Sequence, residues 1–214
     1  MRKFKCGLAV CLAVLLLIGI SVSATDYEQF QGDSVSDKPE IHGYFPDVSS
    51  NATYAEAVNT LAEMGIFTGD ESGNFNPNST ITRAEFAAIM CRLLGEEQDA
   101  QAITAGSFAD VPSSHWACGY VAKAVELGLV SGYGDGRFGP SDTLTYEQAV
   151  KVLVCAIGYE EEVNAAGGYP NGYISVADEL GITNKVDFEI GISATRGATA
   201  QLTWNTIKTI YGGE

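Results

Sequence analysis

Arg83 is the residue whose type and position most directly suggest binding chemistry. It lies in the string Ile-Thr-Arg-Ala-Glu at residues 81–85, in which Thr82 and Glu85 have the spacing of a helix capping box. The string therefore predicts a helix that begins at Thr82, with Arg83 just inside its amino end. Unpaired N–H groups and the helix dipole favour an anion there, and a guanidinium offers two parallel donors that suit a carboxylate. Arg83 is thus a candidate contact for an acidic ligand, and the alternative is a solvated helix-start residue.

The segment that carries Arg83 occurs twice without a gap. When residues 45–95 are shifted by 63 positions, they align with residues 108–158. Glycine, proline, aromatic and acidic residues stay in step, and the matched pairs include Phe45 with Phe108, Asp47 with Asp110, Gly69 with Gly132, Phe75 with Phe138 and Thr82 with Thr145. Self-similarity of this kind indicates stacked units that bury their apolar faces against one another.

A third copy is present in a more divergent form. Tyr169 and Gly181 match Trp116 and Gly128 at a shift of 53, whereas Phe188 matches Phe138 at a shift of 50. The intervening loop is therefore three residues shorter than in the second copy. We expect repeats at residues 45–95, 108–158 and 159–210, with the third one divergent.

Each copy has the pattern of a helix, a loop and a second helix. In the first copy, Tyr54, Val58 and Leu61 follow helical spacing, and Gly65 is placed to end that helix. Glycines and a proline in residues 68–79 predict a loop, which Phe75 is expected to pack onto the helices. In the second copy the later helix has its own capping box, formed by Thr145 and Gln148. No strand pattern occurs, so the predicted fold class is all-α.

The amino-terminal residues and the charge restrict the function classes. Residues 1–24 combine a basic head, an apolar stretch and a small-residue exit, which predicts a secretory signal peptide; a membrane anchor is the alternative, but the apolar stretch is short for one. Residues 25–44 are expected to be a flexible leader. The net charge is −15, and removal of residues 1–24, which carry three positive charges and no negative ones, lowers it to −18. This balance argues against binding to nucleic acid or to an anionic membrane surface.

Catalytic and metal chemistry find little support in the sequence. Cys91, Cys118 and Cys155 lie in apolar, helix-like surroundings without zinc-type spacing, so we expect small buried side chains rather than a disulfide or a reactive thiol. Residues 70–81 resemble a calcium loop only partly, because Phe75 and Ile81 occupy the positions of the loop glycine and the last glutamate. No nucleophile motif appears. We therefore expect no enzyme activity, no metal and no cofactor.

The combined motifs resemble the surface-layer homology (SLH) family over residues 45–210. The resemblance lies in Phe108-Ala-Asp110-Val111, Trp116-Ala, Gly128-Leu-Val-Ser-Gly132, Phe138-Gly-Pro140 and residues 81–85, and for the third repeat in Gly168-Tyr169-Pro170-Asn-Gly-Tyr173 with Ala194-Thr195-Arg196-Gly197. It implies three repeats in a pseudo-threefold arrangement around a central helix bundle. The implied ligand is a secondary cell-wall polymer, often ending in a pyruvylated sugar, that lies in grooves between repeats.

The resemblance also implies which residues contact this ligand. The family's arginine position reads Arg83, Tyr146 and Arg196 in the three repeats, and its tryptophan position reads Thr53, Trp116 and Tyr169. If each groove pairs an arginine with the aromatic residue of the following repeat, only Arg83 with Trp116 is intact. Trp116 either packs internally or presents its face to a sugar ring.

The expected site residues follow from this comparison. The expected ligand contacts are Arg83, Trp116, Arg196, Tyr169 and Tyr146, and the expected structural motif residues are Asp47, Asp110, Thr82, Glu85, Gly69 and Gly132. Asp47 and Asp110 are expected to serve in turns or caps rather than as ligand contacts.

The expected function is non-covalent attachment of a secreted protein to the cell wall, at the cell surface or in an S-layer. The expected partner is a secondary cell-wall polymer or another peptidoglycan-linked glycan, without nucleic acid and without membrane insertion after signal cleavage. Two alternatives remain open: a protein–protein assembly module of the cell envelope, with an envelope protein as partner, and an accessory subunit of an exported enzyme.

Overall fold

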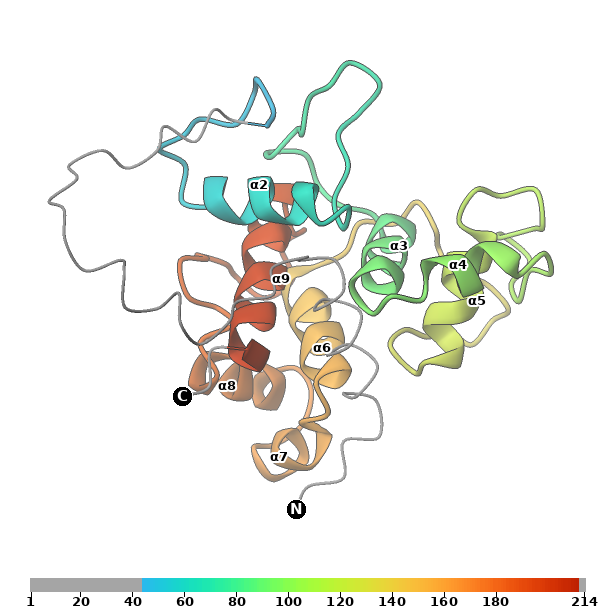
Figure 1. The fold of residues 1–214 in the computed structure, drawn as a ribbon. Helices are drawn as coiled ribbons and strands as arrows, with labels where there is room; N and C mark the ends of the chain where they lie inside the picture. Colours follow the sequence, from blue (N-terminus) through green and yellow to red (C-terminus); the bar gives the residue numbers. More distant parts are fainter. Residues whose placement is uncertain (1–43, 212–214) are drawn as a thin grey trace, which may run out of the picture.

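The computed structural model describes residues 44–211, and every regular element in that range is a helix (Figure 1). The predicted all-α fold class is therefore confirmed. The predicted signal peptide, 1–24, lies outside the described residues, as does the predicted leader except for Tyr44. None of the described helices is long and apolar enough to cross a membrane.

Each repeat contributes two main helices joined by a loop. In chain order the helices are α2 (Ala55–Glu63), α3 (Arg83–Leu93), α4 (Glu97–Ala102), α5 (Cys118–Glu126), α6 (Tyr146–Ala156), α7 (Glu160–Ala165), α8 (Asn171–Glu179) and α9 (Arg196–Tyr211). The capping box at the start of α3 is formed, because Thr82 accepts from the Glu85 N–H and Glu85 accepts from the Thr82 N–H. At the start of α6, Gln148 Oε1 accepts from the Thr145 N–H at 3.2 Å.

The main helices pack in a cyclic order. The second helix of each repeat contacts the first helix of the next: α3 packs on α5, and α6 packs on α8. The last helix of the chain, α9, crosses α2 of the first repeat and so closes the cycle (Figure 1). The first and third repeats are therefore neighbours although they are far apart in sequence.

Three backbone hydrogen bonds join the segments that precede α3, α6 and α9. The N–H of Ile81 donates to the carbonyl of Ala194 at 3.0 Å, that of Ala194 to Leu144 at 2.7 Å, and that of Leu144 back to Ile81 at 2.9 Å. All three residues are buried. One residue from each repeat thus takes part in a closed ring of bonds, which supports the pseudo-threefold arrangement; the symmetry itself stays a prediction.

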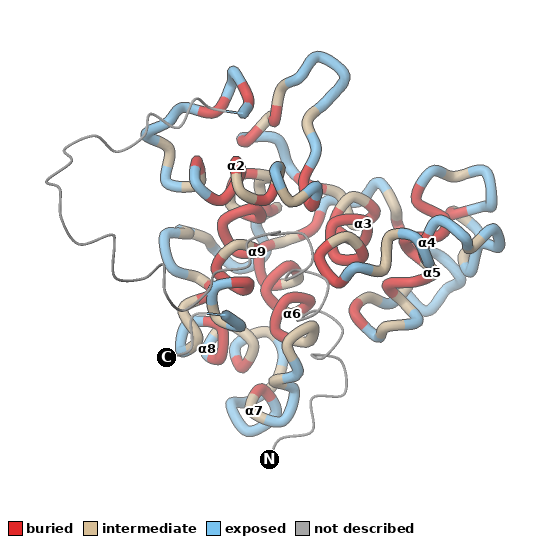
Figure 2. Tube along the Cα trace, in the orientation of Figure 1, coloured by how far each residue is buried: buried red, intermediate tan, exposed pale blue. Residues whose placement is uncertain are grey.

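The loops are packed onto the helices by phenylalanines. Phe75 is fully buried and its ring centroid lies 5.3 Å from that of Phe45, and Phe138 is also fully buried, 5.5 Å from Phe108. A Cβ added at Gly132 would come within 2.4 Å of the Phe108 ring, so this position requires a glycine for the close approach. Figure 2 shows the buried residues along the inward faces of the helices and the exposed ones at the loop tips.

Two short helices, one between the first two repeats and one at the start of the third, were not expected from the sequence. The first, α4, packs on α5, where the buried ammonium of Lys123 lies 3.5 Å from Glu96 and 3.4 Å from Glu126. The second, α7, packs on α8. Six-residue helices show too little periodicity to be recognised, so only their packing reveals them.

The cysteines agree with the expectation for two positions out of three. Cys91 and Cys118 are buried and Cys155 is half-buried, and all three thiols are free. Burial raises the pKa of the Cys91 thiol to about 12, so this thiol stays protonated and unreactive.

Candidate functional site

Arg83, at the first position of α3, extends from the first repeat into the loop of the second. Its Nε donates to the carbonyl of Phe138 at 3.0 Å and its Nη2 to that of Ser131 at 2.7 Å. The guanidinium also lies 4.5 Å from the ring centroid of Phe138 and 5.0 Å from that of Tyr133. Arg83 therefore holds two repeats together through backbone carbonyls and aromatic rings, which the sequence reasoning had not assigned to it.

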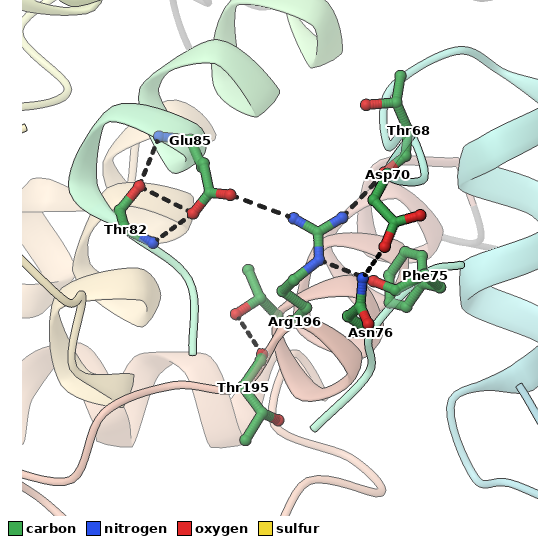
Figure 3. A network of polar contacts seen from close by, with 9 residues as sticks. Thr68, Asp70, Phe75, Asn76, Thr82, Glu85, Thr195 and Arg196 are labelled. Carbon is green, nitrogen blue, oxygen red and sulfur yellow. Dashed lines mark hydrogen bonds and ion pairs between the residues drawn. The ribbon is translucent and has the colours of Figure 1, made fainter. Parts of the chain in front are cut away.

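Arg196, at the start of α9, makes the same contacts one junction further round the cycle. Its Nε donates to Phe75 and its Nη2 to Thr68, both backbone carbonyls at 2.9 Å (Figure 3). Its Nη1 also lies 3.7 Å from the carboxylate of Glu85. Burial lowers the pKa of the Arg196 guanidinium, and the Glu85 carboxylate acts in the opposite direction. The charge of Arg196 is therefore matched inside the protein.

Among the described residues, Arg83 has no carboxylate in the position that Glu85 takes beside Arg196. The second-repeat residue equivalent to Glu85 is Gln148, which carries no charge. Within residues 44–211 Arg83 forms no ion pair, and no hydrogen bond uses its Nη1. The Nη1 edge of this guanidinium thus makes no hydrogen bond or ion pair within residues 44–211, whereas Arg196 already faces a carboxylate.

The amino end of α3 differs from the expectation. The N–H of Arg83 donates to the carbonyl of Asp142 at 2.9 Å, and the N–H of Ala84 donates to that of Pro140 at 3.1 Å. The predicted free N–H groups are therefore occupied by the neighbouring repeat, and that part of the prediction is wrong. An anion near Arg83 would meet the guanidinium and the helix dipole but not free backbone donors.

A groove of about 230 Å³ lies beside Trp116. Its walls come from the start of α3, the segment before α5 and the second-repeat loop, and comprise Thr82, Ala84, Glu85, His115, Trp116, Pro140 and Ser141. The Trp116 ring is 59% exposed and stacks on His115 at 5.9 Å. Arg83 is not among the lining residues although both of its chain neighbours are. The structure thus brings Trp116 to the start of α3 but does not place it in one cavity with the guanidinium of Arg83.

The two tyrosine candidates have different surroundings. Tyr169 is 52% exposed and meets Tyr173 edge-on at 6.2 Å. Tyr146 is buried and stacks on Phe188 at 5.6 Å. Tyr169 thus offers an open ring face, whereas Tyr146 packs into its own repeat junction and belongs to a separate cavity.

Asp47 and Asp110, which occupy the same position in the first two repeats, bind the backbone of the loops. Asp47 accepts from the N–H groups of Phe75 and Asn76 at 2.8 and 2.6 Å, and Asp110 accepts from those of Phe138 and Gly139 at 2.9 and 2.8 Å. Burial alone would raise the pKa of Asp110, but the backbone donors and the charge of Arg137 together outweigh it, and the pKa is lowered. Both carboxylates therefore hold the loops that receive the arginines.

Sequence reasoning missed Ser131 and Tyr133 as partners of Arg83. No local signal pointed to Tyr133, because the first repeat has Asp70 in its place. Among residues 44–211 no group of three or more histidine, cysteine or acidic side chains is arranged to hold a metal ion.

The sequence model of the S-layer homology domain matches residues 44–87 and 107–150. These two ranges cover α2 and α5, the loops that follow them and the starts of α3 and α6, and they include Arg83 and Trp116. The chain belongs to the S-layer homology family. The third S-layer homology repeat is not matched and stays a prediction.

Similar known proteins agree with this assignment. The chain is 33% identical to a cell surface protein of Thermoanaerobacter kivui over 73% of its length, and 35% identical to the middle cell wall protein of Brevibacillus brevis over 74%. An endoglucanase of a Bacillus species is 26% identical over 75% of the chain. The chain spans 20%, 15% and 16% of these relatives. The S-layer homology domain gives the chain a cell-surface, cell-wall-associated localisation and, in general terms, a role in attachment to the wall.

Proposed function

We propose that the chain is a non-enzymatic anchor that holds an anionic secondary cell-wall polysaccharide at the junction of its first and second repeats. The observation that carries this proposal is the guanidinium of Arg83, which forms no ion pair within the described residues, at the start of the same helix that lines the groove of Trp116. Because the overall charge is −15, an anionic polymer is repelled by most of the surface. Binding therefore depends on the few cations that no carboxylate of the protein compensates.

The two residues have complementary roles in this proposal. The Nη1 edge of Arg83 donates to a carboxylate of the polymer, such as that of a pyruvylated sugar. The open face of Trp116 packs against a sugar ring in the groove of about 230 Å³. Arg196 is a weaker second contact, because Glu85 already faces that guanidinium and the first repeat has Thr53 at the aromatic position.

One such contact gives weak attachment. A charge-assisted hydrogen bond contributes about 1.5–3 kcal/mol, which corresponds to a factor of roughly 10–100 in affinity. A polymer that reaches two sites, or two anchors on one surface, gains by effective concentration. Retention on the wall therefore does not require a tight single site.

Sedimentation with purified wall sacculi tests the proposal. The matched variants are R83Q and R196Q, since each loses two bonds to backbone carbonyls of the neighbouring loop. We expect R83Q to bind at least about tenfold more weakly, and R196Q to change by less than about threefold. Circular dichroism shows whether both variants are folded.

Stripping the polymer from the sacculi separates this proposal from its main rival. The polysaccharide proposal requires that the protein no longer sediments with stripped walls. If sedimentation survives stripping but is lost after proteins are extracted from the wall, the chain is a protein–protein assembly module or an accessory subunit instead.

A further inference from the structure

The junction between the second and third repeats holds a larger cavity, of about 790 Å³. It lies where the start of α6 meets the loop between α8 and α9. The equivalent position to Arg83 and Arg196 is Tyr146 here, so this junction has no clamping guanidinium. Its residues give it a different chemical character from the other two junctions.

The floor of this cavity is apolar. The Tyr146 ring stacks on Phe188, with the ring planes 20° apart, at the place where Arg83 covers Phe138 in the preceding junction. Val186 and Ile192 also line the cavity, and the side chain of Ile192 is 53% exposed. The neighbouring Ile190 is exposed to the same extent. This surface would lose unfavourable contact with water if an apolar side chain covered it.

The walls of the cavity are acidic. The carboxylates of Asp178, Asp187 and Glu189 line it, and no lysine or arginine does. Two cations of the preceding junction have no counterpart here. Tyr146 stands at the position equivalent to Arg83, and Asp187 stands at the position equivalent to Arg137. Asp178 accepts from the hydroxyl of Thr183, while within residues 44–211 no hydrogen bond or ion pair uses the side chains of Asp187 and Glu189.

We propose that this cavity docks a basic segment of a separate protein, in which lysines or arginines flank a large apolar side chain. The apolar side chain covers Tyr146, Phe188 and Ile192, and the flanking cations meet Asp187 and Glu189. The wall polymer of the first proposal does not fit, because three carboxylates repel an anion. This site is independent of the one at Arg83, so either proposal can fail alone.

A second copy of the chain is a poor occupant because it has few cations to offer. Most described cations already contact groups of their own chain, namely Arg83, Arg92, Lys123, Arg137, Arg196 and Lys208. Lys185 lies in the loop beside the cavity but does not line it. The net charge of −15 would also bring two acidic surfaces together.

Nuclear magnetic resonance with a defined probe tests this docking. The probe is the peptide acetyl-Lys-Phe-Lys-Leu-Lys-amide, added to the ¹⁵N-labelled protein, and the control is the same peptide with glutamate in place of lysine. We expect amide shifts confined to residues 183–192 and the start of α6 with the basic peptide, and none with the acidic one.

Two double variants make the test specific. D187N/E189Q should weaken binding of the basic peptide about fivefold or more. E63Q/E71Q removes the same number of charges from exposed positions elsewhere and should change it less than twofold. Equal weakening by both, or shifts spread over all acidic surfaces, means non-specific charge attraction and overturns the proposal. The same localised shifts with glucosamine but not with the peptide would make the occupant an amino sugar and also overturn it.

Discussion

The arginines of the first and third repeats have the same bonds but different charge balances. Each guanidinium donates to two backbone carbonyls of a neighbouring loop. Glu85 then compensates Arg196 at 3.7 Å, whereas the equivalent neutral Gln148 leaves Arg83 uncompensated. A single glutamate-to-glutamine difference between two repeats therefore accounts for the ion pair at one junction and its absence at the other.

Trp116→Ala tests the sugar-stacking role without disturbing the core. The side chain is 59% exposed, so the free energy of unfolding should change by no more than about 0.5 kcal/mol. Binding to sacculi should fall severalfold because the ring face is lost. Denaturant unfolding and sedimentation measure the two effects. A destabilised protein with unchanged binding would mean that Trp116 is a packing residue.

Asp110→Asn tests the role of the loop carboxylate. Asparagine has one acceptor oxygen, and its amide would face the second N–H donor, so the midpoint of thermal unfolding should fall by a few degrees. The folded pKa of Asp110 is lowered from 3.8, so its contribution is complete above that pH and is lost as the pH falls through the lower folded value.

Thermal unfolding at several pH values checks both parts of that prediction. The difference in midpoint between wild type and D110N should be largest near neutral pH and should shrink below about pH 3.8. A difference that grows with acidity contradicts the assignment of Asp110 as an ionised acceptor.

Candidate residues were easier to predict than their contacts. Arg83 and Trp116 could be singled out because the capping box and the repeat placed them at defined positions. The hydrogen bonds from the first N–H groups of α3 to the carbonyls of Asp142 and Pro140 could not be predicted. They join residues of different repeats and therefore leave no local pattern in the sequence.

Helices and loops are positioned by caps and glycines that the sequence shows directly. The Thr82–Glu85 box and the positive φ of 71° at Gly65 mark where α3 begins and where α2 ends. The loops are instead positioned by glycines that let the backbone pack closely against neighbouring groups. Gly132 lies against the Phe108 ring and the Arg137 carbonyl, 2.4 and 2.7 Å from where a Cβ would lie.

Gly132→Ala should therefore destabilise the second-repeat loop. The added methyl group forces the Phe108 ring or the loop backbone to move, at a cost of about 1–3 kcal/mol. Urea unfolding measures this, with Ser131→Ala as control because only the backbone carbonyl of Ser131 is used. An unchanged midpoint for G132A would show that the loop is loosely packed.

The cyclic packing makes the chain a single unit rather than a row of repeats. The last helix, α9, covers α2 of the first repeat, and one hydrogen bond from each repeat closes the central ring. Sequence self-similarity predicted stacked units, but it does not show whether a stack is open or closed, because closure depends on the relative orientation of the units.

A stop after Gly158 tests the closure. It removes α7, α8 and α9, exposes the buried face of α2 and opens the ring at Ala194. We expect the truncated chain to lose its cooperative thermal transition. A cooperative transition near the wild-type midpoint would show instead that the first two repeats are stable alone and that closure contributes little.

Calorimetric titration with purified wall polymer, before and after removal of its acidic groups, tests the central claim most directly. The unmatched charge of Arg83 predicts measurable binding of the acidic polymer that weakens at least about tenfold when the acidic groups are removed, and a much smaller difference between the two polymers for R83Q. Equal affinity of the wild type for both polymers would contradict recognition of an anionic sugar at this junction.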